Sequence, residues 1–333
     1  MFDLITMGRS SIDLYSNDVG ASFSQISSFG ASIGGSPLNI AVGSSRLGLK
    51  VALLTAVGAD KVGEFILERL KKQKVETKFI PVIAGTKSSA VVVGIEPPDR
   101  FPTMFYRENA ADIQIGIDDV LALPLAQTRA VQLSGAALAK EPSRSAVFFL
   151  AEEAKALGLT VFLDLDFRAD QWHDPRAYGV QIRALLPMVD VAFGTEEEIN
   201  AAMLRQKEDL IIHNSQITAP EIKGDLEANI KALMSKGLEA LVVKRGANGA
   251  DVYLANAEVI EARGFQVEVV SVLGAGDAFA AGFIYGHLQG WDWYKSTRLA
   301  NACGAIVVTR IGCSEFSAYL PEALDFIESR GGF

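Results

Sequence analysis

The segment SVLGAGDAFAAGF, residues 271–283, joins a short apolar run to a glycine-flanked turn and then to a run of small residues. This order predicts a β-rich run that ends near Val272, a tight turn and a helix. Glycines let the backbone come close to a ligand, and the start of a helix offers free N–H groups and the positive end of the helix dipole. The segment therefore predicts an anion-binding site at a helix N-terminus.

Asp277 lies in the first turn of that predicted helix, beside the anion that its charge would otherwise repel. One interpretation is structural, because aspartate commonly caps helix N-termini. The other is catalytic, because a carboxylate beside an anion site can act as general base for a hydroxyl that attacks phosphorus. The residue alone leaves both interpretations open.

Elsewhere in the chain, short apolar runs alternate with stretches of helical periodicity. One such helix is expected where Val62, Ile66 and Leu70 share a face, and another is expected to begin near Asp225. This alternation is typical of an α/β fold with a doubly wound, mainly parallel sheet flanked by helices. The runs that predict buried strands are 4–7, 51–55, 131–134, 161–164, 189–193 and 241–244.

Two stretches, residues 9–34 and 86–110, do not follow this alternation. Within the second, residues 89–95 and 103–107 have the pattern of strands with no helix between them, which predicts antiparallel pairing. We expect a small antiparallel β sheet that projects from the main domain as a lid, with an ordinary edge hairpin as the alternative. Residues 1–333 are expected to form a single domain that includes this lid, with 205–224 as a surface excursion.

Composition and charge exclude several classes of protein. Hydrophobic residues make up 49% of the 333 residues and charged residues 21%, which is typical of a globular protein. The balance of 31 Lys and Arg against 40 Asp and Glu gives −9 and argues against a partner such as nucleic acid or an anionic membrane. No apolar stretch approaches the ~20 residues that cross a bilayer, so we expect a soluble cytoplasmic protein.

Glycines also precede a predicted helix near the N-terminus, in the segment GGSPLNIA at residues 34–41. Together the two segments resemble the PfkB family of carbohydrate kinases, also called the ribokinase family, and the resemblance spans nearly the whole chain. Further matches fall in the family's order: Asp13, DLDFR at 164–168, GTEEE at 194–198, KRGANG at 244–249 and NACGA at 301–305.

The resemblance implies a ribokinase-like fold and an enzyme that uses ATP and Mg²⁺. It implies that Asp277 deprotonates the sugar hydroxyl, while the amides of Gly274, Ala275 and Gly276 stabilise the transferring phosphoryl group. It also assigns sugar binding to Asp13, Gly34, Gly35 and Asn39, ATP binding to Lys244, Gly246, Gly249, Asn301, Ala302 and Gly304, and Mg²⁺, held through water, to Glu197.

Three departures from the family pattern indicate which subgroup of the family the chain resembles. Ser271, Gly194 and Asp166 stand where many members have Asp, Asn and Asn. With the segments 105–112 and 310–314, these departures make the chain most similar to the 5-dehydro-2-deoxygluconokinases of inositol catabolism, which phosphorylate the terminal hydroxyl of a keto sugar acid. Because Ser271 replaces an Asp of the monovalent-cation segment, we expect little activation by K⁺.

Two arginines are candidates for binding the charged groups of the substrates. Arg107 lies on a predicted lid strand and is expected to hold the carboxylate of the sugar acid; a surface arginine paired with Glu108 or a neighbour is the alternative. Arg168 follows a buried strand at its C-terminal end, where ligands collect in open α/β sheets, so we expect it to bind phosphate; a structural ion pair is the alternative. Asp164 and Asp166 are expected to orient neighbouring groups rather than to bind metal.

Competing functions remain at this level. Within the family they are a 2-keto-3-deoxygluconate kinase, a fructokinase or a ribokinase; outside it, a catalytically silent sugar or nucleotide sensor. A nicotinamide-dependent dehydrogenase would need a Gly-x-Gly-x-x-Gly turn after the first strand, where the chain has Gly8-Arg9-Ser10. The expected partners are a small sugar or sugar acid and a second copy of the chain bound through the lid.

Overall fold

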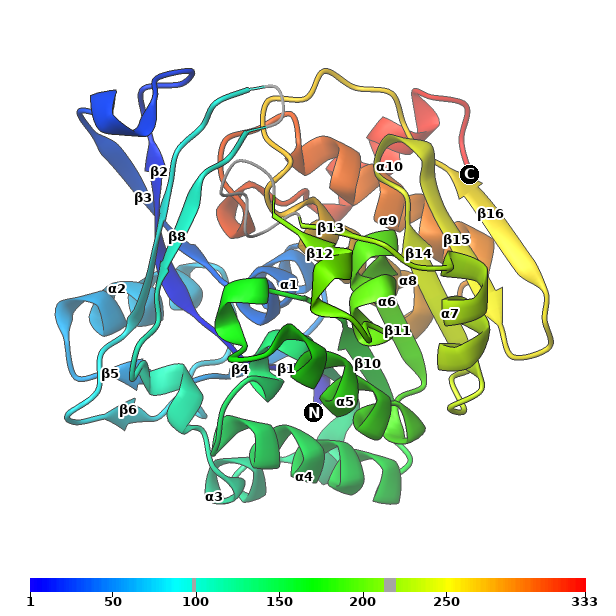
Figure 1. The fold of residues 1–333 in the computed structure, drawn as a ribbon, viewed down its shortest axis with the longest axis horizontal. Helices are drawn as coiled ribbons and strands as arrows, with labels where there is room; N and C mark the ends of the chain where they lie inside the picture. Colours follow the sequence, from blue (N-terminus) through cyan, green and yellow to red (C-terminus); the bar gives the residue numbers. More distant parts are fainter. Residues whose placement is uncertain (98–99, 213–219) are drawn as a thin grey trace.

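The computed structural model describes residues 1–97, 100–212 and 220–333 and places an eight-stranded sheet at its centre (Figure 1). The strand order is β16-β15-β14-β11-β10-β9-β1-β4, parallel from β4 to β14 and antiparallel for the last two strands. The strands are β1 (Phe2–Met7), β4 (Val51–Leu54), β9 (Thr128–Ser134), β10 (Thr160–Asp164), β11 (Val191–Thr195), β14 (Ala240–Lys244), β15 (Gly249–Leu254) and β16 (Val259–Arg263).

Side chains alternate along each central strand between two hydrophobic clusters, one on each face of the sheet. In β10, Phe162 packs on one face while Val161 and Leu163 pack on the other. Both faces need helical cover because both are apolar. One face is covered by α1 (Ser36–Arg46), α2 (Lys61–Lys72) and α8 (Ala275–Leu288), with α9 (Trp293–Val307) and α10 (Leu320–Glu328) beyond them; the other by α3 (Ile117–Leu121), α4 (Ser143–Ala156), α5 (Pro175–Leu185), α6 (Glu196–Ala202) and α7 (Leu226–Met234).

These elements confirm the predicted fold class and the six predicted strands. They also confirm the helix around Ile66, and α7 begins after Asp225, whose carboxylate accepts a hydrogen bond from the Ala228 amide. The expected strand before Val272 is wrong. The sheet ends with β16, and residues 264–273 form no strand; instead, the amides of Val270 and Ser271 both donate to the Val308 carbonyl.

A second, four-stranded sheet stands beside the first at the left of Figure 1. It contains β2 (Ser11–Ser16), β3 (Phe29–Gly34), β7 (Ser89–Val93) and β8 (Thr103–Tyr106), in the order β3-β2-β7-β8. These strands come from the two stretches expected to form a lid, although residues 98–99 lie outside the described part. Two of the pairings are antiparallel, but β2 and β7 pair in parallel.

Short strands complete the structure. They are β5 (Val57–Gly58) with β6 (Val82–Ile83), and β12 (Leu210–Ile211) with β13 (Glu221–Ile222). The second pair lies in the expected surface excursion, of which residues 213–219 fall outside the description. Among the described helices, none combines the length and the apolar character needed to cross a membrane.

Candidate active site

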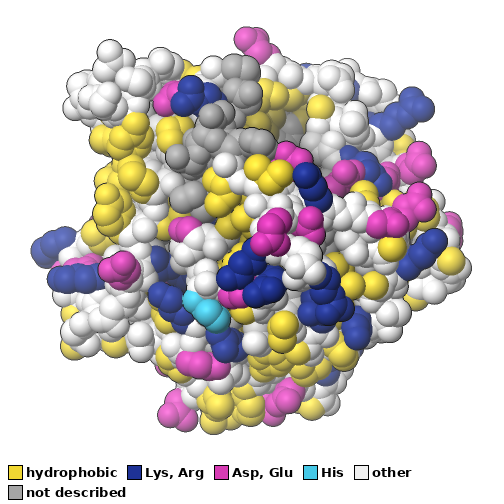
Figure 2. Space-filling view, in the orientation of Figure 1, with side chains coloured by type: hydrophobic (Ala, Val, Ile, Leu, Met, Phe, Trp, Pro, Cys, Tyr) yellow, Lys and Arg dark blue, Asp and Glu magenta, His cyan; other side chains and the backbone are white. Residues whose placement is uncertain are grey.

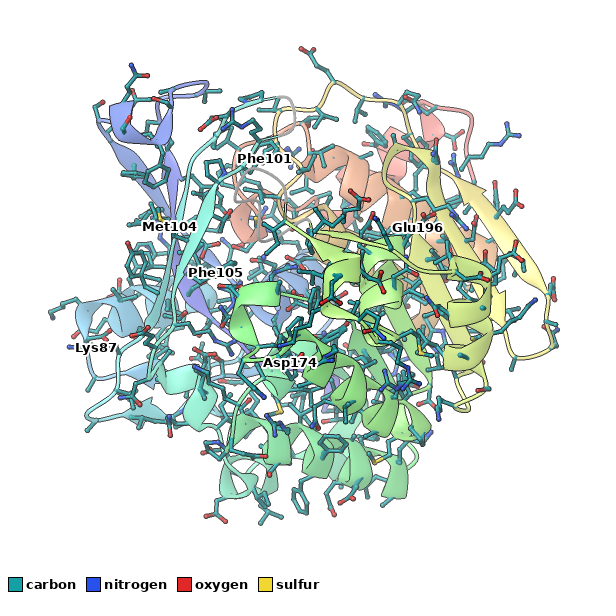
Figure 3. The ribbon with its side chains drawn as sticks, in the orientation of Figure 1. Lys87, Phe101, Met104, Phe105, Asp174 and Glu196 are labelled. Atoms are coloured by element: carbon teal, nitrogen blue, oxygen red, sulfur yellow. The ribbon has the colours of Figure 1, made fainter. Side chains whose placement is uncertain are left out.

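A cavity of about 720 Å³ lies between the second sheet and the C-terminal ends of the main parallel strands. Such strand ends are the usual ligand site of open α/β sheets. The inner face of the second sheet closes one side through Tyr15, Val91 and Phe105. Figure 3 shows Phe105 and Met104 on opposite faces of β8, as strand geometry requires.

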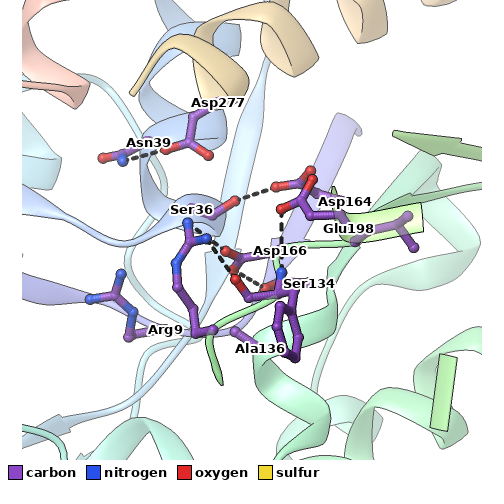
Figure 4. A network of polar contacts seen from close by, with 12 residues as sticks. Arg9, Ser36, Asn39, Ser134, Ala136, Asp164, Asp166, Glu198 and Asp277 are labelled. Atoms are coloured by element: carbon purple, nitrogen blue, oxygen red, sulfur yellow. Dashed lines mark hydrogen bonds and ion pairs between the residues drawn. The ribbon is translucent and has the colours of Figure 1, made fainter. Parts of the chain in front are cut away.

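Asp277 lies in the cavity wall as the third residue of α8. The helix begins after Gly274, whose positive φ of 78° is a left-handed conformation that favours glycine. Asn39, from α1, donates through Nδ2 to Asp277 Oδ2 at 2.7 Å (Figure 4). Burial raises the pKa of Asp277, although the bond from Asn39 opposes this shift. Asp277 is therefore an oriented carboxylate with raised basicity at the positive end of the helix dipole.

Asp13 lies in the same cavity on β2 and is buried. Ser11 Oγ donates to its Oδ1 at 2.6 Å, and the Tyr15 hydroxyl donates to its Oδ2 at 3.1 Å. A Cβ at Gly34 on the paired strand would overlap the Asp13 carboxylate, so glycine is required there even though Gly34 does not line the cavity itself. Burial raises the pKa of Asp13.

The ends of β10 and β14 carry two ion pairs. Asp164 accepts a bond from Ser36 Oγ at 2.8 Å and lies 3.2 Å from Lys244 Nζ, while Arg168 lies 2.8 Å from Asp166 Oδ1. Burial raises the pKa of Asp164 to about 7, and the adjoining carboxylates raise that of Lys244 against the effect of burial. As expected, Asp166 orients Arg168, which still lines the cavity.

Lys244, at the end of β14, lies close to the glycine turn that begins α8. A Cβ at Gly276 would lie 3.1 Å from Lys244 Nζ, so the ammonium group and the helix start face the same space. Both favour an anion. Because Asp277 lies in the first turn of the same helix, one wall of the cavity combines a carboxylate with groups that favour an anion.

The opposite end of the cavity is lined by glycines and apolar side chains. Gly246, Gly249, Asn301 and Gly304 line it, together with apolar residues of the segment that follows β16. Asn301 Nδ2 donates to the carbonyls of Ala262 and Arg263 and so fixes α9 against β16. Ala302, which was expected to bind ATP, is fully buried in the packing between helices and does not line the cavity.

Glu197 lines the cavity from the start of α6 with an exposed side chain. The neighbouring Glu198 is instead used structurally: it accepts from the Thr195 amide and lies 3.5 Å from Lys244 Nζ. In the described residues, no group of three or more His, Cys, Asp and Glu side chains could hold a metal ion. A single free carboxylate fits an Mg²⁺ ion that takes its other ligands from nucleotide phosphates and water.

Arg107 lies away from the cavity. Its Nε and Nη2 donate to Asp112 Oδ2 at 2.8 and 2.5 Å, and its Nη1 reaches the Ala136 carbonyl and Gln171. Only 5% of the side chain is exposed. The expected role in carboxylate binding therefore does not match this geometry, in which Arg107 anchors the end of β8 to the main domain.

The cavity thus gathers most of the expected site residues and excludes Gly34, Arg107 and Ala302. Those that line it are Asp13, Gly35, Asn39, Arg168, Glu197, Lys244, Gly246, Gly249, Gly274, Ala275, Gly276, Asp277, Asn301 and Gly304. The sequence interpretation missed Arg9, Tyr15 and Cys313, which also line it. Arg9 could have been found, because it follows the C-terminal end of the first strand; Cys313 has no comparable signal.

Comparisons with known proteins agree with this arrangement. Residues 1–318 match the pfkB family carbohydrate kinases. The 5-dehydro-2-deoxygluconokinase of Bacillus anthracis (strain CDC 684 / NRRL 3495) is 32% identical over 329 residues, covering 98% of this chain and 95% of that protein. The protein of the same name from Geobacillus thermodenitrificans (strain NG80-2) is 31% identical over 327 residues, covering 98% and 93%.

Solved structures share the fold. A putative Ribokinase II from E. coli in complex with ATP and Mg²⁺ has a TM-score of 0.84 at 24% identity, covering 99% of this chain and 100% of that chain. A fructokinase with bound ATP from Xylella fastidiosa has a TM-score of 0.83 at 24% identity, with 99% of each chain covered. At this identity the likeness shows the ribokinase-like fold.

Fold and cavity together define a sugar kinase, an enzyme that moves a phosphoryl group to an alcohol. The chain belongs to the pfkB family of carbohydrate kinases, whose members use ATP. The predicted family, fold and enzyme class are confirmed.

Proposed function

We propose that the chain transfers the γ-phosphoryl group of ATP to the terminal hydroxyl of a keto sugar acid, 5-dehydro-2-deoxy-D-gluconate. The observation that carries the phosphotransfer is the half-buried Asp277 carboxylate, held by Asn39 at the start of α8. The choice of acceptor is supported by the names of the relatives that are 31–32% identical over nearly the whole chain.

The proposed reaction uses the two ends of the cavity. The acceptor sugar binds beside Asp13 and Asn39, whose Oδ1 is buried without a partner in the described residues and can accept a bond from a sugar hydroxyl. The nucleotide binds along the end lined by Gly246, Gly249 and Gly304. The phosphates then meet the glycine turn between the two ends.

Asp277 takes the proton from the terminal hydroxyl as the hydroxyl oxygen attacks the γ-phosphorus. The new O–P bond forms while the bond from the γ-phosphorus to the bridging β–γ oxygen breaks, and ADP leaves with that electron pair. Amides of the glycine turn, with Lys244 and Arg168, stabilise the negative charge on the transferring group.

Mg²⁺ bound with ATP would neutralise phosphate charge, and Glu197 is the residue that we place beside it. In this proposal the metal arrives with the nucleotide, because the described residues provide no cage of their own. Titration with EDTA should abolish turnover and excess Mg²⁺ should restore it. Full activity in EDTA would contradict the proposal.

A coupled assay for ADP release tests the function directly. The purified chain is given ATP with 5-dehydro-2-deoxygluconate, 2-keto-3-deoxygluconate, fructose or ribose, and kcat/KM is compared among the four. The highest value is expected for 5-dehydro-2-deoxygluconate. A higher value for another sugar would reassign the acceptor within the family, whereas sugar binding without ADP release would indicate a sensor.

A further inference from the structure

Arg9 lies at the cavity wall just beyond the end of β1. Its Nη1 donates to Ser11 Oγ at 2.9 Å, and its guanidinium carbon lies 5.1 Å from the centroid of the Phe105 ring. Ser11 in turn donates to Asp13, which places Arg9 at the sugar end of the cavity. A hydroxyl group and an aromatic ring thus hold the guanidinium group without neutralising its charge.

The other two cations that line the cavity have carboxylate partners. Arg168 pairs with Asp166 at 2.8 Å, and Lys244 pairs with Asp164 at 3.2 Å. Within residues 1–97, 100–212 and 220–333, Arg9 forms no such ion pair. A half-buried cation without a carboxylate partner is an attractive site for an anionic ligand, because the low dielectric of the cavity strengthens their interaction.

The remaining charges of the cavity explain why an acidic substrate needs this group. The carboxylates that line it are Asp13, Asp164, Glu197, Glu198, Glu221 and Asp277. This lining and the net charge of −9 repel an anion from the sugar end, where Asp13 lies. A planar guanidinium with unused N–H donors can offset that repulsion and hold a carboxylate through two parallel bonds.

We propose that Arg9 binds the carboxylate of the substrate and so selects sugar acids over neutral sugars. This inference rests on the proposed function and gives Arg9 the role first expected for Arg107, whose donors are occupied by Asp112. The acid end of the substrate then lies between Arg9 and the second sheet, and its terminal hydroxyl reaches Asp277.

The test compares Arg9→Gln and Arg9→Lys with the wild type. Glutamine keeps an N–H donor for Ser11 and removes the charge; lysine keeps the charge and loses the planar fork. Arg176→Gln is the matched control, since it removes one charge from an exposed arginine that pairs with Asp174 outside the cavity. Thermal unfolding of every variant establishes that it is folded.

Binding of 5-dehydro-2-deoxygluconate and of fructose is measured by calorimetry without ATP, and turnover is measured separately. In Arg9→Gln we expect affinity and KM for the acid to weaken roughly 10-fold to 100-fold, the range of a lost charge-assisted bond. The affinity of Arg9→Lys for the acid should lie between those of the wild type and Arg9→Gln. The affinity of each Arg9 variant for fructose should equal that of the wild type, and Arg176→Gln should bind both sugars as the wild type does.

The two proposals fail in different ways. If the wild type phosphorylates the acid but Arg9→Gln weakens the acid and fructose equally, or weakens neither, the role of Arg9 is overturned and the function stands. If the wild type phosphorylates only neutral sugars, the function is overturned. In that case, acid binding that still depends on Arg9 would support its role, and acid binding that does not would overturn it. Should Arg9→Gln not fold, the same comparison is made with Arg9→Lys.

Discussion

Asp277 is the residue on which the proposed chemistry depends most. Asp277→Asn keeps the size of the side chain and removes the base. We expect kcat to fall roughly 10²-fold to 10⁴-fold, because general-base catalysis contributes about that much, while sugar affinity is largely retained. Steady-state kinetics and calorimetric binding measure the two effects. A near-normal kcat in the folded variant would show that Asp277 is not the general base.

The raised pKa of Asp277 predicts how the rate depends on pH. The general base must be ionised, so kcat falls as pH decreases through its pKa, and burial places that pKa above the ordinary 3.8. Asp164, whose pKa is raised to about 7, could produce a similar acidic limb. The limb should persist in Asp164→Asn if Asp277 causes it. Its disappearance in that variant would assign it to Asp164.

Asp164 also predicts a pH dependence of stability. Its folded-state pKa of about 7 lies above the ordinary carboxyl pKa of 3.8, so the folded chain binds more protons than the unfolded chain between these limits. The free energy of unfolding of the wild type, relative to Asp164→Asn, should therefore decrease as pH rises from 3.8 to about 7. Urea titrations across this range measure it; a relative stability that rises with pH would show that the Lys244 pair keeps Asp164 ionised.

At the level of elements, α9 presents two alanines with different surroundings. Ala305 lines the nucleotide end of the cavity, whereas Ala302 lies one turn earlier in the packing between helices. Ala305→Phe should raise KM for ATP and leave KM for the sugar unchanged. Ala302→Phe should instead destabilise the fold by about 1–3 kcal/mol, as overpacked cores do. Steady-state kinetics and thermal melting of the two variants measure these effects. If Ala302→Phe both raised KM for ATP and lowered stability while Ala305→Phe did neither, these assignments would be wrong.

The same helix shows why sequence predicted the site only in part. Small residues at 301, 302 and 304 fit either a flat ligand or a tight helix contact, and sequence does not give the rotation of the helix that decides between them. Gly274 and Asp277 were predictable, because a glycine turn before a helix is a local feature whose chemistry depends on neighbours in sequence.

The strands, like the site residues, were predictable from the sequence only in part. Apolar runs predicted the parallel strands of the main sheet, because burial on both faces produces continuous hydrophobic sequence. The run before Val272 is apolar for another reason: Phe265 packs with α9 and α10, and Leu273 packs under the second sheet. Arg107 was assigned to the ligand because sequence places it on a strand but not beside Asp112, which occupies its donors.

At the scale of the whole molecule, the second sheet has one face that serves the site and one that faces solvent. Its inner residues, Tyr15, Val93 and Phe105, pack together with Cys313 beside the cavity. Figure 2 shows hydrophobic side chains gathered over the outer side of this sheet at the upper left. They include Phe29, Met104 and Tyr106, which are 37%, 37% and 62% exposed.

We propose that this outer face pairs with the same face of a second copy, because contiguous exposed apolar residues commonly mark interfaces. Light scattering should then give twice the 35.7 kDa of one chain. Replacing Met104 and Tyr106 by lysine should produce monomers by placing like charges across the interface. Tyr294→Lys on α9, at a residue that is 42% exposed, is the control and should remain dimeric.

The dimer would also affect catalysis, because the outer face lies on the same thin sheet as the groups that line the sugar end. Burying Met104 and Tyr106 against a partner would hold β8, and with it Phe105 beside Arg9, in one position. The lysine variant should therefore raise KM for the sugar more than KM for ATP, whose end of the cavity is formed by the main domain. Dimeric behaviour of the lysine variant would contradict the proposed interface. Monomers with an unchanged sugar KM would show that the inner face holds its shape without a partner.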